Sequence, residues 1–447
     1  MGPVDVRQVN LTIDLCLRVG ELLLASGAGA ADVTATMQLL AKHLGLRGAE
    51  TDVTFINVSM HYQAGPEEPH VMANRQVKAR VIDYEDLTRV DHLIRAVLRD
   101  ELDLKEARNE LARIVSTGHS RPRWAVTVGM AVMAAGVTVQ LGGDALVAAL
   151  ACVAAAVIDR VQLALTRRRI PVFYQQVVGA GVASTLAVVA AASPLQVDVS
   201  TAVTANIIML LAGIGFMGAI QDALTGFYIT AGARITEALL STGGIIAGVS
   251  GGFALAQLLG VQIPRLAPGA TSLQSVGLSL AGAAVGAAAF AYASYAPHRI
   301  LLPIAVIAGA AMGLVALIPD DVSRAWQVAA AAFFVGLVSY SVSGRLRVPP
   351  LVTVVSAVVP LLPGLAIYRG LALLAEEGDS ASAGLLALVS AASVAVALAS
   401  GVILGEYVAQ PLRREARRVE ARLAGPRLVG PVRPVRRRRR RRERASA

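Results

Sequence analysis

Charged residues are scarce in this chain. They make up 16% of its 447 residues, whereas hydrophobic residues make up 55% and the mean hydropathy is +0.60. A soluble globular protein of this length carries about 25% charged residues, because its surface must face water. The shortage of charge therefore argues against a soluble protein and favours a membrane protein.

Cysteine is also scarce, with only Cys16 and Cys152 in the chain. This excludes a disulfide framework, and no metal-binding spacing is present, so we expect no metal and no cofactor. A secretory signal is missing too, because Asp14, Arg18 and Glu21 interrupt the apolar residues around Cys16. The chain is therefore expected to begin in the cytosol.

Lysine is nearly absent, occurring only at Lys42, Lys78 and Lys105, and with the abundant alanine this indicates a GC-rich bacterial genome. Arginine is concentrated at the C-terminus, where residues 411–447 hold 15 arginines and three glutamates. We expect this segment to be a disordered cytosolic tail that attracts anionic membrane lipid. Nucleic-acid binding is not expected beside a membrane domain.

Residues 1–122 are polar enough for a small cytosolic α/β domain. Apolar residues recur at helical spacing from Leu11 to Leu24, and Asp32 is typical of the cap of a second helix that runs to Leu44. Thr51–Gln63 alternates like a strand, with a hairpin partner at 69–77. Two amphipathic helices, broken near Asp103, are predicted after Tyr84.

Beyond residue 122 the chain predicts a polytopic α-helical membrane protein with about ten spans. The predicted spans are 124–142, 144–164, 171–192, 201–220, 233–258, 271–295, 299–318, 323–342, 350–374 and 382–407. Arginines gather in the loops that a cytosolic N-terminus would place inside, so both termini are predicted to be cytosolic. The polar break Gln262–Ser272 divides the spans into halves at 123–260 and 261–410. Five spans in each half predict an inverted repeat.

Two short motifs in these spans resemble soluble-enzyme signatures. Gly213, Gly215 and Gly218 satisfy the dinucleotide-binding pattern G-x-G-x-x-G, and Gly248–Gly252 fits the G-x-S-x-G elbow around Ser250. A nucleotide turn needs a parallel sheet, whereas these glycines lie in long apolar segments, and no histidine is available nearby to activate Ser250. Close helix packing is the better interpretation, as for Gly282 and Gly286.

Ionisable and helix-breaking residues mark the fourth span of each half. Asp222 follows the glycines in the first half, with Arg234 and Glu237 in the next span, where Arg234 is expected to hold Glu237 or a carboxylate. Charges at membrane depth each cost about 2–3 kcal/mol or more, so they indicate a functional site. In the second half Pro360, Pro363 and Gly364 must interrupt the helix, and Tyr368 and Arg369 follow.

Paired helix breaks of this kind suit a small zwitterion. The N-terminus of a half-helix attracts a carboxylate, and freed carbonyl groups accept hydrogen bonds from an ammonium group. Thr225, Tyr228 or Asn206 would bond an alcohol on the ligand. The glycine Gly226 lies between the first two of these.

Four segments resemble the threonine/serine exporter family: "LLLASGAGAADVTATMQLLAKHLGL", "TDVTFINVSM", "QDALTGFYITAGARITEAL" and "VPPLVTVVSAVVPLLPGLAIYRGL". The resemblance extends to about residue 410. It implies a cytosolic N-terminal domain, about ten membrane helices, and export of threonine and serine driven by the proton-motive force. The family patterns fall on Asp222, Leu224, Gly226, Gly232, Arg234, Glu237 and Ala238, and on Pro360, Leu361, Pro363, Gly364 and Tyr368.

Several alternatives stay open. Related two-component members imply small dicarboxylates, such as succinate, as a second substrate class. A channel-like pore fed by a hydrolytic N-terminal domain would need a triad built from Ser26, His43 and Asp32. A non-enzymatic domain that gates the transporter or assembles it into a homo-oligomer is the preferred interpretation. Asp222 is the first candidate for coupling to protons or binding the substrate ammonium group, and Glu237 is the second.

Overall fold

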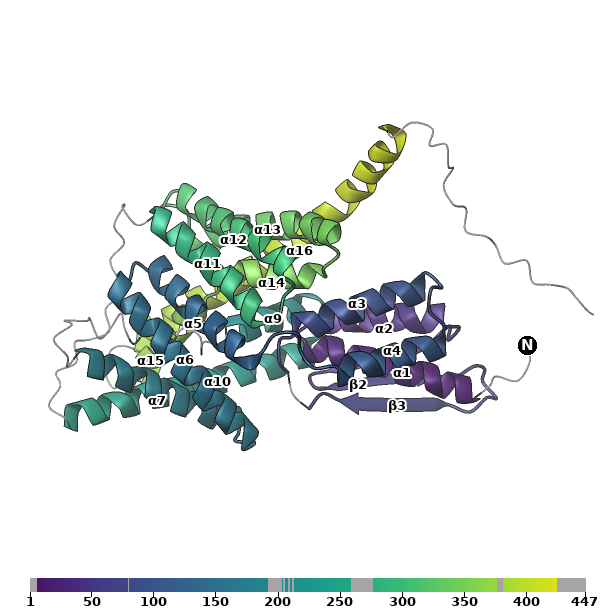
Figure 1. Cartoon of the computed structure of the whole chain (residues 1–447), viewed down its shortest axis with the longest axis horizontal. Coiled ribbons are helices and arrows are strands. Elements are labelled where there is room, and N and C mark those ends of the chain that lie inside the picture. Colours follow the sequence, from purple (N-terminus) through teal and green to yellow (C-terminus); the bar gives the residue numbers. More distant parts are fainter. Residues whose placement is uncertain are drawn as a thin grey trace, which may run out of the picture.

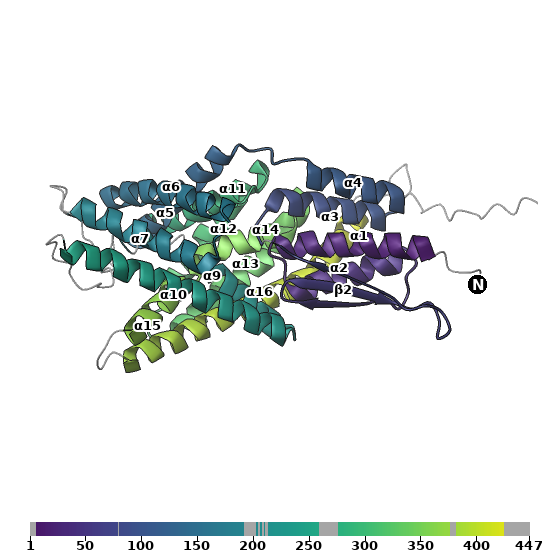
Figure 2. The same ribbon diagram turned by 90° about the horizontal axis from the view of Figure 1, so that it is seen from below.

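The computed structural model describes residues 6–78, 80–191, 203, 206–207, 210, 213–258, 276–375 and 381–423. These residues form two parts that lie side by side along the longest axis (Figure 1). The N-terminal unit comprises four helices and a small sheet, and the helical bundle comprises all later helices. The view from below shows the same division (Figure 2).

The N-terminal unit has the helices that apolar periodicity predicts. Its helices are α1 (Val6–Ala25), α2 (Ala30–His43), α3 (Tyr84–Leu98) and α4 (Leu104–Ser116). The predicted break near Asp103 is confirmed: this side chain accepts from the Glu106 N–H, and Glu106 accepts from the Asp103 N–H in return. Such a capping box satisfies two amides that a helix start leaves free.

The sheet of the N-terminal unit has three antiparallel strands in the order β1 (Glu50–Thr54), β2 (Asn57–Tyr62) and β3 (Val71–Gln76). The predicted single strand over Thr51–Gln63 is wrong, because the chain turns back at Phe55, where φ is +54°. The predicted hairpin partner over residues 69–77 is confirmed as β3. Helix α1 packs on β2 and β3, so one sheet face is covered by helices.

Asp32 is not the cap of α2. Gly29 occupies the N-cap position and has no side chain to offer, while Asp32 lies in the first helical turn. The Ala30 N–H instead donates to Asp222, a residue of the bundle, over 2.9 Å. The capping role that the sequence predicts for Asp32 is thus performed by Asp222, which lies 192 positions from Ala30 in the chain.

Among the described residues, the helical bundle contains seven helices that are long and apolar enough to cross a membrane. The number is eight if the bent pair Pro350–Leu361 and Gly364–Leu374 is counted as one span. The helices are α5 (Arg123–Gln140), α6 (Ala145–Arg167), α7 (Val172–Ala191), α9 (Gly213–Leu224), α10 (Tyr228–Leu258), α11 (Val276–Ala293), α12 (His298–Leu317), α13 (Arg324–Leu346), α14 (Pro350–Val358), the short 3₁₀ turn η3 (Val359–Leu361), α15 (Gly364–Ala375) and α16 (Ala381–Leu423). The molecule is therefore a polytopic helical membrane protein.

Two of the ten predicted spans are not matched by such a helix. Helix α5, which is 18 residues long, is not among the helices that pass, although it packs along α6 and α11. The predicted span 201–220 lies largely outside the described residues, and its described end is the twelve-residue helix α9. The count of ten therefore stays a prediction.

Glycines bring the long helices into close contact. A Cβ atom at Gly282 of α11 would lie 2.5 Å from the Gly136 carbonyl oxygen of α5, and one at Gly248 of α10 would lie 2.2 Å from the Val177 carbonyl oxygen of α7. Only hydrogen fits at these distances, so the packing interpretation of Gly248–Gly252 and of Gly282 is confirmed, whereas a Cβ atom at Gly215 would meet nothing within 4 Å. Ser250 is exposed on α10.

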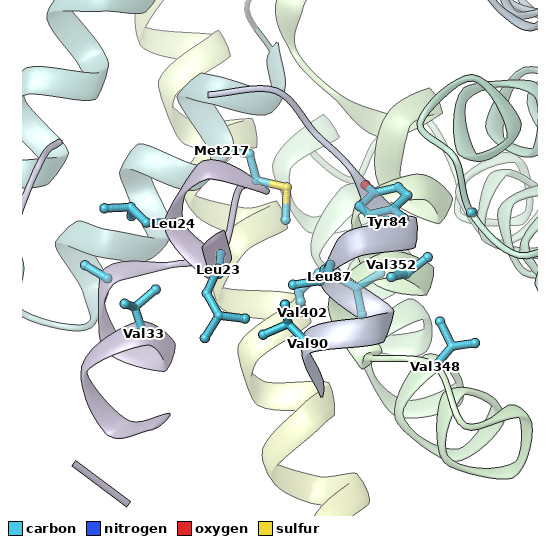
Figure 3. Packing of buried hydrophobic residues seen from close by; sticks show 14 of the residues in the cluster. Leu23, Leu24, Val33, Tyr84, Leu87, Val90, Met217, Val348, Val352 and Val402 are labelled. Atoms are coloured by element: carbon cyan, nitrogen blue, oxygen red, sulfur yellow. The ribbon is translucent and has the colours of Figure 1, made fainter. Parts of the chain in front are cut away.

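One hydrophobic core joins the N-terminal unit to the bundle. Figure 3 shows Leu23, Leu24, Val33, Tyr84, Leu87 and Val90 of the unit beside Met217, Val348, Val352 and Val402 of the bundle. The ring of Tyr84, which is 1% exposed, also meets Phe290 of α11 edge-on at 6.3 Å. The two parts are thus packed together rather than merely linked.

Candidate functional site

A cavity of about 160 Å³ lies inside the bundle beside α5. Its walls come from five elements that are far apart in the sequence: α5, α9, α11, η3 and α15. The lining residues are Met130, Met133, Val137, Gln140, Leu141, Gly213, Ile214, Phe290, Val359, Pro360, Leu362, Gly364 and Leu365. Most are apolar, and Gln140 is the polar side chain among them.

The predicted break in the second half forms one wall of this cavity. The segments Pro350–Leu361 and Gly364–Leu374 are bent by 48° relative to each other. Helix α15 starts afresh at Gly364, so the N–H groups of its first turn have no acceptor within the helix. The freed carbonyl of Pro360 accepts a hydrogen bond from Gln140 Nε2 over 2.9 Å. Gln140 Oε1 is buried and has no partner among the described residues.

The glycine motif of the first half meets this break. A Cβ atom at Gly213 would lie 3.1 Å from Leu362 Cβ and 3.5 Å from the Gly364 nitrogen. Gly213 of α9 and the first turn of α15 therefore adjoin one cavity. Gly215 and Gly218 lie within α9, so these two glycines are not themselves a break. The next interruption in the chain is at Gly226, where φ is +93°.

The carboxylate of Asp222 lies at a different place, where α9 meets the N-terminal unit. Arg234 Nη1 is 2.8 Å from Asp222 Oδ2, and the side chains are 6% and 1% exposed. Arg234 also donates to the Ala28 carbonyl over 3.4 Å. Gly218 leaves room for this guanidinium, since a Cβ atom there would lie 3.2 Å from Arg234 Nη1. Of the two predicted partners of Arg234, Glu237 or another carboxylate, the structure shows a carboxylate, that of Asp222.

Glu237 instead contacts another part of the N-terminal unit. It accepts from Arg80 Nη2 over 3.0 Å, and the same guanidinium lies 4.4 Å above the ring of Phe55. The Phe55 N–H donates to Thr230 Oγ1 over 3.0 Å. The start of α10 is thereby bonded to the β1–β2 turn as well as to the loop before α2. We name these contacts, with the Asp222–Arg234 pair, the interpart latch.

Asp32 stands beside the interpart latch. Although Asp32 is an exposed residue, the protein atoms around its carboxyl group raise its pKa, and the negative charge of Asp222 raises it further. The raised pKa means that a second full negative charge beside Asp222 is disfavoured. The ion pair with Arg234 is thus next to a carboxyl group that binds a proton more readily than usual.

The remaining predicted site residues do not line the cavity. Thr225 donates to the Gln221 and Asp222 carbonyls of its own helix, and Tyr228 is 73% exposed on the bundle surface. Asn206 donates to the Ala183 carbonyl over 2.9 Å, and Tyr368 is buried with α6, α7 and α10. Pro363 accepts from the Ile367 N–H at the start of α15.

Sequence reasoning missed Gln140 and Arg80. Gln140 is an ordinary polar residue at the end of an apolar segment, and no local pattern connects it to Pro360. Arg80 lies in a loop. A signal existed only for Asp222 and Pro360, whose residue types are costly in an apolar span.

The hydrolytic triad is not assembled. Asp32 and His43 stand at opposite ends of α2, about 16 Å apart at 1.5 Å per residue. His43 Nε2 contacts Asp100 Oδ1 over 3.2 Å instead. A hydrolase site built from Ser26, His43 and Asp32 is therefore excluded.

Membrane-spanning helices around a small cavity, with a broken span at its wall, define a membrane transport protein. The chain belongs to the threonine/serine exporter family, since two family models for threonine/serine exporters match residues 14–256 and 279–408. It is a transporter and not an enzyme.

Two curated relatives cover most of the chain. A protein of Mycobacterium tuberculosis named "Probable threonine/serine exporter" is 36% identical over 94% of this chain and 80% of its own length. The "Threonine/serine exporter" of Corynebacterium glutamicum is 31% identical over 93% of this chain and 87% of its own length. The chain is accordingly a multi-pass bacterial membrane protein. No solved structure matches it.

Proposed function

We propose that the protein is a secondary transporter that exports threonine and serine across the bacterial cytoplasmic membrane. The names of both relatives support this substrate class. The observation that carries the proposal is the cavity at which Gly213 of α9 adjoins the first turn of α15. Both termini are cytosolic in this proposal, and the N-terminal unit is a cytosolic α/β domain.

The cavity suits a small zwitterion with a hydroxyl group. Unpaired N–H groups at a helix start attract a carboxylate. The unpaired Gln140 Oε1 can accept from an ammonium or hydroxyl group, which removes the cost of leaving it unsatisfied. The cavity of about 160 Å³ is proposed to hold one such small amino acid.

An inverted repeat of five helices per half is supported by matching helix pairs. The third and fifth helices of the first half, α7 and α10, approach at Gly248 and Gly252, and their counterparts α13 and α16 approach at Gly401 and Gly405. The first helices of both halves, α5 and α11, pack against each other at Gly136 and Gly282. In such a repeat the broken spans meet at the substrate.

Alternating access in this proposal requires the interpart latch to open. The cytosolic domain covers the end of the bundle that α9 and α10 share, so it acts as the inner gate. The proposed drive is the proton-motive force, with Asp222 as the coupling carboxylate and Glu237 as the second candidate. Protonation of Asp222 would remove the charge that holds Arg234, and so loosen the latch.

Small dicarboxylates are a second candidate substrate class, because the helix start at Gly364 beside the cavity attracts a carboxylate. Efflux from proteoliposomes under a defined pH gradient, comparing threonine, serine and succinate, distinguishes the two classes. We expect threonine and serine to leave faster than succinate. Faster succinate efflux would replace the amino-acid assignment.

The cavity itself is tested by Gln140→Leu, which removes the acceptor and the bond to Pro360. We expect threonine efflux to fall at least tenfold, with Gln221→Leu on α9, outside the cavity, as the matched control. Equal efflux from Gln140→Leu and the control in folded protein would show that substrate passes elsewhere.

A further inference from the structure

A second and larger cavity, of about 400 Å³, lies between α3 and α4 of the N-terminal unit. Its apolar floor includes Leu93 and Ile114, which are 4% and 5% exposed. Its polar lining is Arg89, His92, Glu110, Arg113 and Thr117. An apolar floor with a few convergent polar groups is the usual composition of a small-molecule site.

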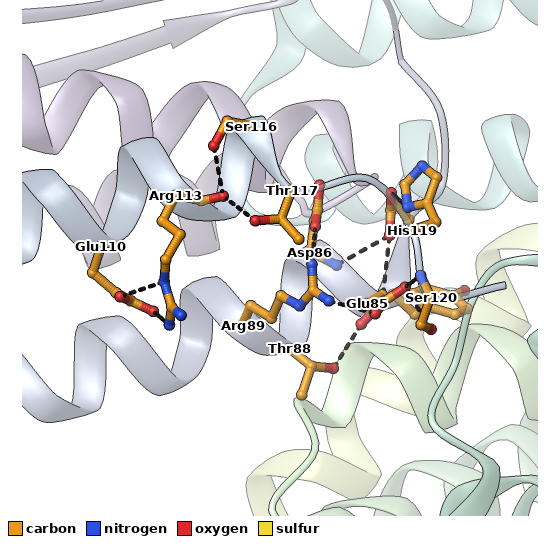
Figure 4. A network of polar contacts seen from close by, with 12 residues as sticks. Glu85, Asp86, Thr88, Arg89, Glu110, Arg113, Ser116, Thr117, His119 and Ser120 are labelled. Carbon is orange, nitrogen blue, oxygen red and sulfur yellow. Dashed lines mark hydrogen bonds and ion pairs between the residues drawn. The ribbon is translucent and has the colours of Figure 1, made fainter.

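The polar lining carries both signs of charge. Arg113 donates to Glu110 through Nε over 2.9 Å and through Nη2 over 2.5 Å. The two side chains are 71% and 35% exposed, so this pair is screened by water and contributes little to stability. Figure 4 shows Arg89 between this pair and the group formed by Glu85, Asp86 and His119. A ligand with one positive and one negative group can therefore replace the Arg113–Glu110 contact at small cost.

Both walls of this cavity are connected to elements that line the 160 Å³ cavity in the bundle, which we call the transport cavity. On the α3 wall, His92 Nε2 is hydrogen-bonded to the Arg347 carbonyl over 2.9 Å. Arg347 ends α13 in a left-handed conformation, with φ at +53°, directly before the broken span begins at Pro350. On the α4 wall, Thr117 begins the linker to α5, and Arg121 of that linker donates to the Tyr292 carbonyl at the end of α11 over 2.6 Å.

We propose that the α3–α4 cavity is a regulatory site for a free α-amino acid, and that its occupancy biases the broken span and α5. The ligand's carboxylate pairs with Arg113, its ammonium group pairs with Glu110, and its side chain lies on Leu93 and Ile114. A ligand that binds one conformation better shifts the molecule toward it, and transport substrate then affects ligand binding in return. The regulatory effect rests on the proposed transport function, whereas the binding site does not.

The binding site is tested by titrating the full chain in lipid nanodiscs with threonine and counting bound molecules per chain. We expect two for the wild type, and one for the double variant Glu110→Gln with Arg113→Gln. Lys105→Gln removes an exposed charge from the same helix and should leave two. Threonine amide and N-acetylthreonine, each lacking one charge, should bind only at the transport cavity or not at all.

A double variant that still binds two threonine molecules would overturn the proposal. The proposal would also fail if the wild type bound a single threonine molecule and only Gln140→Leu abolished that binding. Regulation is measured separately, by the internal threonine concentration at half-maximal efflux. We expect the double variant to shift this concentration at least threefold. Because the double variant keeps Gln140, its maximal efflux rate should stay at the wild-type value. If threonine binds at the α3–α4 cavity but neither the wild type nor any variant shows efflux, the transport function is refuted and the binding site is still supported.

Discussion

Asp222 shows how a single residue can join two parts of a membrane protein. Its carboxylate accepts from the Ala30 N–H at the start of α2 and pairs with Arg234. The negative charge is favourable at a helix N-terminus, and α2 has no capping side chain of its own. Asp222 is therefore both the partner of a buried cation and the cap of a helix in the other part.

Asp222→Asn should destabilise the protein by about 3–5 kcal/mol, because it leaves the buried guanidinium of Arg234 without a counter-charge. Exchanging the charges, with Asp222→Arg and Arg234→Asp, should not restore stability, since arginine cannot accept from the Ala30 N–H. Thermal unfolding and hydrogen exchange at the start of α2 measure both effects.

The matched control for Asp222 is Glu237→Gln, which removes the half-exposed pair with Arg80 and should cost about 0–1 kcal/mol. Equal melting temperatures for Asp222→Asn and Glu237→Gln would contradict the assigned role of Asp222.

At the scale of helices, glycines decide which pairs pack closely. Helices α5 and α11 approach through Gly136 and Gly282, where a side chain would collide with backbone atoms. Because lipid is as apolar as the helix surface, such close backbone contact is a main source of helix association in a membrane.

Gly282→Ala should lower stability by about 1–3 kcal/mol, because its Cβ atom would lie 2.5 Å from the Gly136 carbonyl oxygen and the Gln140 nitrogen. Gly277→Ala on the same helix is the control, since nothing lies within 4 Å of the added atom. Thermal unfolding in detergent should separate the two variants. If both unfold at the wild-type temperature, the α5–α11 contact is looser than described.

At the scale of the whole molecule, the N-terminal unit and the bundle share one core. Met217 of α9 is 2% exposed and lies among side chains of the N-terminal unit (Figure 3). A loss of packing at this junction should therefore loosen the N-terminal unit too, although the substituted residue belongs to the bundle.

Cys16 reports on this shared core. Burial raises the pKa of its thiol to about 12, so its thiolate fraction at pH 8 is about a thousandfold below that of an ordinary thiol. In a Cys152→Ala background, maleimide should label Cys16 only when the N-terminal unit opens. Met217→Ala, which costs about 2–5 kcal/mol, should speed this labelling.

The control for this experiment is Met72→Ala on β3, where the side chain is 60% exposed and should not matter. Identical labelling rates for Met217→Ala and Met72→Ala would mean that the two parts open independently.

The sequence by itself determined the membrane class, most helix positions and the break at Pro360–Gly364. These features depend on local physics: apolar length, helix periodicity and the missing N–H of proline. The strand at Thr51–Gln63 was mispredicted because a turn at Phe55 has no glycine or proline to mark it.

Only the tertiary structure decided which marked residues meet. It placed Gly213 against Gly364 and Gln140 against Pro360 at one cavity, and it carried Asp222 to the start of α2 instead. Each of these contacts joins residues more than a hundred positions apart. Their partners are fixed by how helices pack across the whole chain, and no local pattern of residues carries that information.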